Sequence, residues 1–486
     1  MSSLEELRAE RVKKLNMLKE KGVNPYPIAS HRDTTCAQAQ NDFDALEGKG
    51  EITLAGRVMA LRGQGKLLFA DIFDGTANFQ IVCKSDSLED FDTLAETLDR
   101  GDICAFTGTL FMTQRGEKSV EAKSWRMLAK ALLPLPDKWH GLKDTEERFR
   151  KRYLDTLSSE EVRERFAIRA KTISALRRIL DEAEYVEVET PVLQAVAGGA
   201  LAEPFVTHHN ALDIDMYLRV APELYLKQLL VGGFPKVYEL GRIFRNEGID
   251  VTHNPEFTML EYYEAFADAD SQRAFTEKLV REVFTVALGE PVLKVNGEEV
   301  SLAESFAVMT FAEVFEKYAD MKSPFDMDRT ALASEAKKHD VDVKESDAPD
   351  KILDNMYKKV CRPHMIAPTF IIEYPKAFSP FAKEQEEGDG MIDRFQLIVG
   401  GFEIANAFSE LNDPEEQRAR FAEQEKKREG GEREISPNDE AYIEAMEYGM
   451  PPAGGVGIGV DRLVMLANDT RNIREAILFP TLRPRE

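Results

Sequence analysis

The sequence predicts an α+β protein in which a small β-barrel precedes a larger domain, built on an antiparallel sheet with flanking helices. Three observations support this. About five short strand-like runs fall between residues 51 and 128, which is typical of a small barrel. Residues 159–183 have the apolar spacing of an amphipathic helix. Two alternating runs then flank a polar loop in KVYELGRIFRNEGIDVTHNPEFTMLEYYEAF, which favours an antiparallel pair.

Composition limits the class of protein. A chain of 486 residues is too long for one ordinary core, so several domains are expected. No apolar run approaches the ~20 residues of a membrane helix, and we expect no membrane association. The four cysteines lack CxxC spacing, which fits a reducing cytoplasm. The net charge, 63 − 87 = −24, argues against a nucleic-acid binder, so RNA binding would need local basic patches.

Residues 1–48 are expected to form an N-terminal helical segment. Ser3 and Glu6 have the spacing of a capping box, and Gly22 with Pro25 ends the helix that they begin. Several lysines and arginines make this helix basic. They fit either a solvated helix face or a contact with an RNA backbone.

Residues 49–134 are expected to form the barrel. The runs LLFADIF and NFQIVC flank Asp74-Gly75, a strong hairpin signal. Alternation puts Phe69 and Gln80 on the outer face, where an aromatic ring and an amide could stack on and read single-stranded bases. An exposed phenylalanine is also common without any such role. Residues 135–145 are expected to be a linker, because the prolines of the segment LLPLPDKWHGLKD, Pro134 and Pro136, break both helix and strand.

The antiparallel pair carries an unusual set of polar side chains. Alternation puts Arg245 and Glu247 on one face of the first strand, and Phe257, Glu261 and Tyr263 on one face of the second. Such a face would be a poor core and a good floor for a charged ligand. The alternative is an exposed face with surface ion pairs.

The segment GGFEIANAFSELNDP adds further polar residues. Asn406, Phe408 and Glu410 share a face if the segment is a strand, whereas Glu403 is out of phase with them. A kink near Ala405 is therefore needed to bring all four side chains together. An ordinary strand is the alternative.

The segment PPAGGVGIGVDRLVML reads as a glycine-rich strand that enters a helix near Asp461-Arg462. Glycines let a flat base or ribose approach the backbone, and Arg462 would then face a phosphate. No GxxxxGK[ST] motif occurs, so ATP, if used, is not held by a P-loop.

These segments resemble the signature motifs of a known family. EVETPVL, FRNEGIDVTHNPEF and GGVGIGVDR resemble the three motifs of class II aminoacyl-tRNA synthetases, and APELYLK and AFSELNDP resemble their lysyl branch. VNPYP and LPLPDKWHGL resemble the N-terminal region of that branch, so the resemblance covers nearly the whole chain in order. It implies an OB-fold that reads the anticodon, a class II catalytic domain over residues 146–486, and a homodimer built partly around Pro191.

The resemblance also implies an activity. Such an enzyme activates L-lysine with ATP and Mg²⁺ to lysyl-adenylate and pyrophosphate, and then transfers lysine to the 3′ end of tRNA(Lys). The chemistry needs no protein nucleophile, which agrees with the lack of any Ser/His/Asp or Cys/His set. Catalysis would rest on positioning and on charge stabilisation by the two implied catalytic residues, Arg245 and Arg462.

The residues that the resemblance implies can be given by role. Glu410 and Tyr263 would meet the ε-ammonium group of lysine, and Glu223, Glu261 and the Gly199 backbone would receive its α-amino group. The implied lysine-binding residues are Gly199, Glu223, Glu261, Tyr263, Asn406, Phe408 and Glu410. The implied ATP-binding residues are Arg245, Glu247, His253, Asn254, Phe257, Glu403 and Arg462. The implied anticodon-binding residues are Arg62, Phe69, Gln80 and Glu117.

The metal site departs from the family pattern. Glu403 is the implied magnesium ligand, but Gln396 stands where the family normally has a second metal-binding glutamate. An amide oxygen adds no charge, so we expect weaker magnesium binding. Phe402 stands where related sequences usually carry arginine.

Three alternatives remain at this point. An enzyme of the same fold that lysylates a protein would lack the barrel region, which is present here. An aspartyl or asparaginyl relative would need a cationic or amide group for its substrate side chain, where Glu410 is anionic. A non-enzymatic RNA-binding module would have no need of Arg245, Glu247, Glu403 and Arg462.

Overall fold

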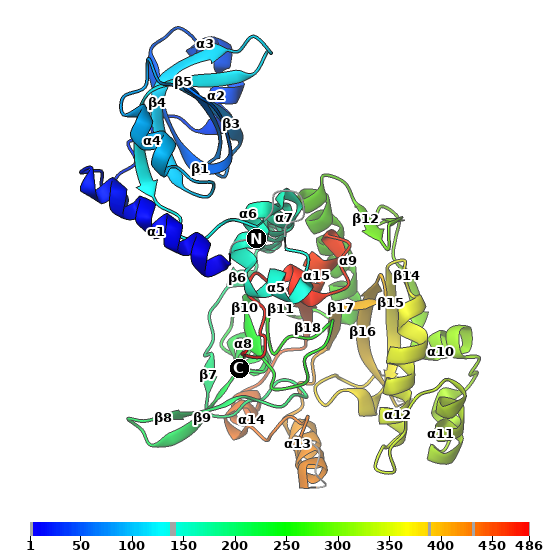
Figure 1. Cartoon of the computed structure of the whole chain (residues 1–486). Coiled ribbons are helices and arrows are strands. Elements are labelled where there is room, and N and C mark those ends of the chain that lie inside the picture. Colours follow the sequence, from blue (N-terminus) through cyan, green and yellow to red (C-terminus); the bar gives the residue numbers. More distant parts are fainter. Residues whose placement is uncertain (1–2, 137–141, 387–389, 430–432, 486) are drawn as a thin grey trace. The chain divides into compact units, whose positions relative to one another are not determined.

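The structure, a computed structural model, describes residues 3–136, 142–386, 390–429 and 433–485. The chain divides into two compact units, residues 1–143 and 144–486 (Figure 1). Residues 137–141, in the expected linker, lie outside the described ranges. Within those ranges, no helix is both long and apolar enough to cross a lipid bilayer.

The first unit opens with helix α1 (Leu4–Glu20). The predicted capping box is confirmed: the Glu6 backbone N–H donates to the Ser3 hydroxyl, and the Ser3 N–H donates to the Glu6 carboxylate. Leu15 and Leu18 are buried and attach the second half of the helix to the unit. The other helices of this unit are α2 (Cys36–Asn41), α3 (Phe43–Leu46) and α4 (Phe91–Thr97).

Five strands close the predicted barrel in the order β1-β2-β3-β5-β4. Figure 1 shows the barrel in blue and cyan. The expected alternation is confirmed, because Ala70, Ile72 and Ile81 are fully buried inside while Phe69 and Gln80 are half-buried on the outside. The strands are β1 (Glu51–Gln64), β2 (Leu67–Phe73), β3 (Asn78–Lys84), β4 (Ile103–Met112) and β5 (Lys118–Ala129).

The second unit contains an eight-stranded sheet of order β14-β15-β16-β17-β18-β11-β10-β6. Its central pairs are antiparallel, as predicted, and only the outermost pairs, β14–β15 and β10–β6, are parallel. The strands are β6 (Val186–Glu187), β10 (Lys236–Phe244), β11 (Glu256–Ala265), β14 (Ala307–Thr310), β15 (Thr369–Pro375), β16 (Met391–Val399), β17 (Phe402–Ser409) and β18 (Ala453–Gly459).

Three helices cover one face of this sheet: α7 (Glu160–Glu182), α9 (Ala269–Leu288) and α15 (Val460–Ala467). The first of them confirms the helix predicted over residues 159–183. Tyr262 and Ile458 from the sheet pack with Leu176, Val283 and Leu463 from the helices in one apolar core. This core holds the middle strands rigidly.

The opposite face is covered by a second set of helices. Helices α8 (Glu223–Val231), α10 (Phe311–Ala319), α12 (Pro349–Met356) and α14 (Glu440–Glu447) pack there in a second core with Val237 and Ile398 of the sheet. The remaining elements are α5 (Thr145–Arg150), α6 (Arg152–Ser158), β7 (Leu193–Gln194), β8 (Val206–His209), β9 (Ile214–Leu218), β12 (Val292–Val295), β13 (Glu298–Ser301), α11 (Arg329–Lys338), α13 (Pro414–Glu429) and α16 (Ile473–Ala476).

One predicted strand is much shorter than expected. YVEVETPVL alternates like a strand that stops near Pro191, but it pairs with β10 only through Val186 and Glu187. The physical reason lies at Thr190, whose backbone N–H and hydroxyl both donate to the Glu239 carboxylate, at 3.1 and 2.6 Å. These bonds replace a further ladder pair.

Candidate active site

A cavity of about 460 Å³ lies on the open face of the eight-stranded sheet. Glu410 and Gln396 are the two implied ATP-, lysine- or metal-binding residues that do not line it; both are buried outside its wall. The implied residues that line it are Gly199, Glu223, Arg245, Glu247, His253, Asn254, Phe257, Glu261, Tyr263, Glu403, Asn406, Phe408 and Arg462.

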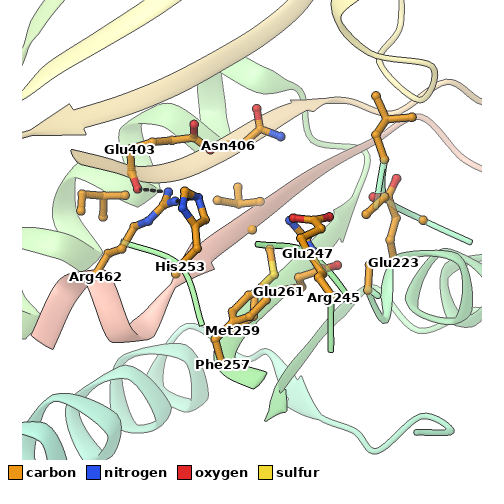
Figure 2. Close-up of a pocket in the computed structure, with 18 of the residues that line it drawn as sticks. Glu223, Arg245, Glu247, His253, Phe257, Met259, Glu261, Glu403, Asn406 and Arg462 are labelled. Atoms are coloured by element: carbon orange, nitrogen blue, oxygen red, sulfur yellow. Dashed lines mark hydrogen bonds between the residues drawn. The ribbon is translucent and has the colours of Figure 1, made fainter. Parts of the chain in front are cut away.

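Strand β11 supplies the floor. Phe257, Met259, Glu261 and Tyr263 all line the cavity, which confirms the alternation read from the sequence. Figure 2 shows the first three of them. Leu260 and Tyr262, which alternate with these four residues along the strand, belong to the apolar core beneath. One strand therefore presents an aromatic, a thioether, a carboxylate and a phenol to the same ligand.

Strand β10 ends earlier than predicted. Its last residue is Phe244, so the expectation that Arg245 and Glu247 lie on this strand is wrong. The Arg245 N–H still donates to the Pro255 carbonyl at 2.9 Å, which extends the pairing by one residue before the chain leaves the sheet. Both side chains nevertheless reach the cavity wall.

Strand β17 has the predicted kink. Leu397 pairs with Ala405 and Ile398 with Glu403, so β17 has one extra residue, Ile404, opposite β16. This bulge changes the phase of the strand. As a result, Glu403 and Asn406 both line the cavity although they are three positions apart.

Strand β18 approaches the cavity without side chains. A methyl group at Gly455 would overlap the Glu410 carboxylate and the Tyr263 ring. At the end of the strand, the buried Asp461 accepts bonds from the Thr258 N–H at 2.7 Å and from Arg169 at 2.5 Å. Sequence reasoning missed this role of Asp461, which its position directly before Arg462 could have suggested.

Near Arg245 and Asn254 the described cavity wall has polar atoms without a partner. Arg245 stacks over Phe257, with its guanidinium carbon 5.3 Å from the ring centroid. Among the described residues, neither the buried Arg245 Nε nor the buried Asn254 Oδ1 has a hydrogen-bond partner. Buried polar groups are normally paired, so these atoms indicate a polar ligand.

One end of the cavity is cationic. Arg462 donates to the Glu403 backbone carbonyl at 2.9 Å, and its other terminal nitrogen lies 3.3 Å from His253 Nε2 (Figure 2). Burial alone would raise the pKa of Glu403, but the net shift is downward because cations surround it. These cations are Arg462, Arg362, Arg394 and Lys358, and all four line the cavity.

The other end is acidic. Glu223 and Glu261 are 7% and 3% exposed, and Figure 2 shows Glu223 at the opposite end of the cavity from Arg462 and Glu403. Burial and the nearby Glu223 raise the pKa of Glu261 to about 8. The Tyr263 hydroxyl, which the resemblance implies to act together with Glu410, donates to the Glu261 carboxylate at 2.9 Å.

An internal cation balances part of this acidic end. Lys227 is fully buried and forms ion pairs with both Glu223 and Glu410. Its ammonium also lies 4.9 and 5.4 Å from the ring centroids of Phe381 and Phe408. With three carboxylates ionised and one ammonium present, two negative charges remain for a ligand. The sequence contained a signal, since Glu223 and Lys227 are four apart on α8.

The residues fit one magnesium contact better than a two-carboxylate site. Glu403 faces the cavity, but the Gln396 amide oxygen accepts bonds from Tyr374 at 2.8 Å and from Tyr357 at 3.3 Å. No group of three or more His, Cys, Asp or Glu side chains suited to a metal occurs in the described part of the chain.

The implied anticodon residues gather on the outside of the barrel. Arg62 pairs across the ladder with Phe69, and forms an ion pair with Asp71 at 3.0 Å. Gln80 lies opposite Asp71, and its amide oxygen accepts a bond from Ser119 at 2.9 Å. The exposed Glu117 lies two residues before Ser119. The adjacent positions fit a short stretch of single-stranded nucleic acid.

Comparison with known proteins agrees with this geometry. Residues 144–483 match the family of class II tRNA synthetases (D, K and N), and residues 52–128 match the OB-fold nucleic acid binding domain. A lysine–tRNA ligase of Moorella thermoacetica is 46% identical over 99% of this chain and 98% of its own length. Those of Pelotomaculum thermopropionicum and Carboxydothermus hydrogenoformans are also 46% identical, over 99% of this chain and 96% and 99% of their own lengths.

Replacing Lys227 with methionine should destabilise the protein in a pH-dependent way. The change leaves Glu223 and Glu410 buried without their cation, which costs about 3–5 kcal/mol when both are ionised. Burial already raises the pKa of both carboxyls, and losing Lys227 raises each pKa further. An acid with a raised folded-state pKa loses stability as pH rises. The difference in free energy of unfolding should therefore be large at pH 8 and small near pH 5.

Urea denaturation at the two pH values measures this effect. Lys236→Met is the matched control, because Lys236 forms a more exposed pair with Glu264 and should change stability by less than about 1 kcal/mol at either pH. A loss for Lys227→Met that is equal at both pH values would contradict the role given to its charge.

Proposed function

The chain belongs to the class II tRNA synthetases of the D, K and N group and is an ATP-dependent lysine–tRNA ligase, and we propose that its cavity is where lysine is activated. One observation carries the proposal. A single sheet face holds an acidic end around Glu223 and Glu261 and a cationic end around Arg462. Lysine and ATP have the complementary charges.

The acidic end fits a substrate with two ammonium groups. Glu223, Glu261 and the Gly199 backbone receive the α-amino group, because these three line the cavity together. Tyr263 and Glu410 receive the ε-ammonium group. In support, the buried Glu410 Oε1 has no hydrogen-bond partner among the described residues, and it lies with the Tyr263 ring against Gly455, which lines the cavity.

The middle and the cationic end fit ATP. Adenine stacks on Phe257, and Glu247, His253 and Asn254 contact the rest of the nucleotide. Arg245 lies between the two ends in Figure 2, where it can hold the α-phosphate and the lysine carboxylate together, with Asn406 close to the same carboxylate. Arg462 holds the bent triphosphate from the other side.

The reaction then needs positioning and charge, with no protein nucleophile. The lysine carboxylate attacks the α-phosphorus, the bond to the bridging oxygen breaks, and pyrophosphate leaves. Arg245 and Arg462 stabilise the charge that develops on the phosphate oxygens. Mg²⁺ bound with ATP would supply further neutralisation, with Glu403 as the residue that holds it. The tRNA ribose then attacks the lysyl carbonyl and AMP leaves.

The barrel and the assembly complete the proposal. Residues 49–134 bind the anticodon of tRNA(Lys) through Arg62, Phe69, Gln80 and Glu117. Residues 146–486 form the catalytic domain. Residues 1–48 form an N-terminal helical segment. We propose a homodimer, from the motif at Pro191, and a cytoplasmic location, as suits a translation enzyme.

Lysine-dependent ATP–pyrophosphate exchange tests the assignment of the ends. We expect exchange with lysine only, and none in Arg245→Ala. Glu410→Gln should lower kcat/KM for lysine, with a loss of about 2–5 kcal/mol in transition-state stabilisation, because it removes one charge of a buried pair. Glu444→Gln, on the exposed side of α14, is the control and should be unchanged. Normal lysine kinetics in Glu410→Gln would refute the ε-ammonium assignment.

Lysine binding should release a proton between pH 6 and 8. Glu261, with its pKa raised to about 8, is protonated in the free protein below that pH and must ionise to bind an ammonium group. Affinity for lysine should therefore fall as pH is lowered, by up to about tenfold per pH unit. Calorimetry at pH 7 in buffers of different ionisation enthalpy measures the released proton. Glu261→Gln should bind lysine weakly and release none, whereas a wild type without proton release would be inconsistent with the assignment.

Phe69→Ala should separate the barrel from the chemistry. Loss of one stacked base costs about 1–3 kcal/mol, so charging of tRNA(Lys) should weaken roughly 5- to 150-fold. ATP–pyrophosphate exchange should stay at the wild-type rate, and Phe69→Tyr should retain most charging. Equal loss of both activities in Phe69→Ala would mean that this side chain is structural.

A further inference from the structure

Two cations at the cavity come from outside the motif segments. Lys358 lies in the turn of π-helix Tyr357–Cys361, and Arg362 begins the 3-10 turn Arg362–His364, both after α12. Both line the cavity, and both lower the pKa of Glu403 by their charge. They therefore face the same end of the site as Arg462.

Arg362 is the cation with the fewest hydrogen bonds and ion pairs among the four described at this end of the cavity. Its Nε is buried and has no hydrogen-bond partner, and its guanidinium makes no ion pair with any residue in the described ranges. Arg394, by contrast, donates to the Asn406 side chain at 2.9 Å and to the Phe378 carbonyl at 3.0 Å. Lys358 keeps a half-exposed pair with Asp354 at 2.7 Å.

A guanidinium at a cavity wall whose Nε is buried without a partner calls for an anion. Glu403 feels the charge of Arg362, but the two side chains form no ion pair within the described part of the chain. The neighbouring Gln396 is neutral, and its oxygen is taken by Tyr357 and Tyr374. The protein therefore places positive charge here that its own side chains do not satisfy.

We propose that Arg362, assisted by Lys358, binds the β- and γ-phosphates of ATP and the pyrophosphate product. A guanidinium matches two phosphate oxygens at once and stays charged at any working pH. In this chain the neutral Gln396 stands where a second metal-binding carboxylate is expected. Protein cations thus supply part of the neutralisation of the phosphates that a second metal ion would otherwise supply. The inference rests on the proposed placement of ATP in this cavity.

Direct binding to the full-length protein tests the proposal without turnover. Calorimetry would measure the binding affinities of ATP, pyrophosphate, AMP and lysine, each in EDTA and in excess Mg²⁺. In EDTA, Arg362→Ala should weaken ATP and pyrophosphate binding about tenfold to a hundredfold, the effect of losing a hydrogen bond to a charged group. AMP and lysine, which lack the terminal phosphates, should bind as in the wild type.

Two further variants keep the result interpretable. Lys359→Ala is the matched control, because the adjacent Lys359 is exposed and donates to the Asp340 carbonyl, and it should bind every ligand normally. Arg362→Lys should recover part of the pyrophosphate affinity, as a charge-based role requires.

Unchanged pyrophosphate and ATP affinities in Arg362→Ala would overturn the proposal, and so would an equal loss of AMP and lysine, which would indicate a structural role. A failure of the proposed function looks different. In that case the wild type shows no lysine-dependent exchange, whatever Arg362 binds.

Discussion

Opposite charges lie at the two ends of one sheet face, and the rest of the site depends on keeping them apart. Burying either set alone is expensive, because desolvation penalises ionised groups. The apolar core beneath the sheet, formed by α7, α9 and α15, holds β11, β17 and β18 in place, so that the two sets cannot collapse onto each other. A ligand that is positive at one end and negative at the other relieves both penalties at once.

Buried charge is neutralised in different ways at the two ends of the cavity. At the acidic end, Lys227 neutralises part of a carboxylate cluster from within, and the protonation of Glu261 removes more. At the cationic end, Glu403 is one acid among four cations, and the excess remains. The first arrangement adapts by moving a proton, whereas guanidinium groups cannot release theirs near neutral pH.

Much of this could be predicted from periodicity and motifs. Alternation identified the residues that β11 turns to the cavity, and the phase of Glu403 required the kink that the bulge at Ile404 provides. Partner choice could not be predicted in this way. Alternation puts Tyr263 and Glu261 on the same face of their strand, but it does not tell whether the hydroxyl donates to this carboxylate or to a ligand. Arg362 lies in a π-helical and 3-10 segment, where neither helical nor strand periodicity applies.

The extra residue on β17 makes this strand unusually intolerant of changes in length. Deleting Ile404 would restore regular pairing with β16. Every residue of β17 on one side of the deletion would then face the opposite side of the sheet. Glu403 would exchange its place at the cavity for one against apolar helices. A chain with this deletion would thus keep all its active-site side chains and still be inactive. Related chains should therefore differ at β17 by substitutions far more often than by deletions.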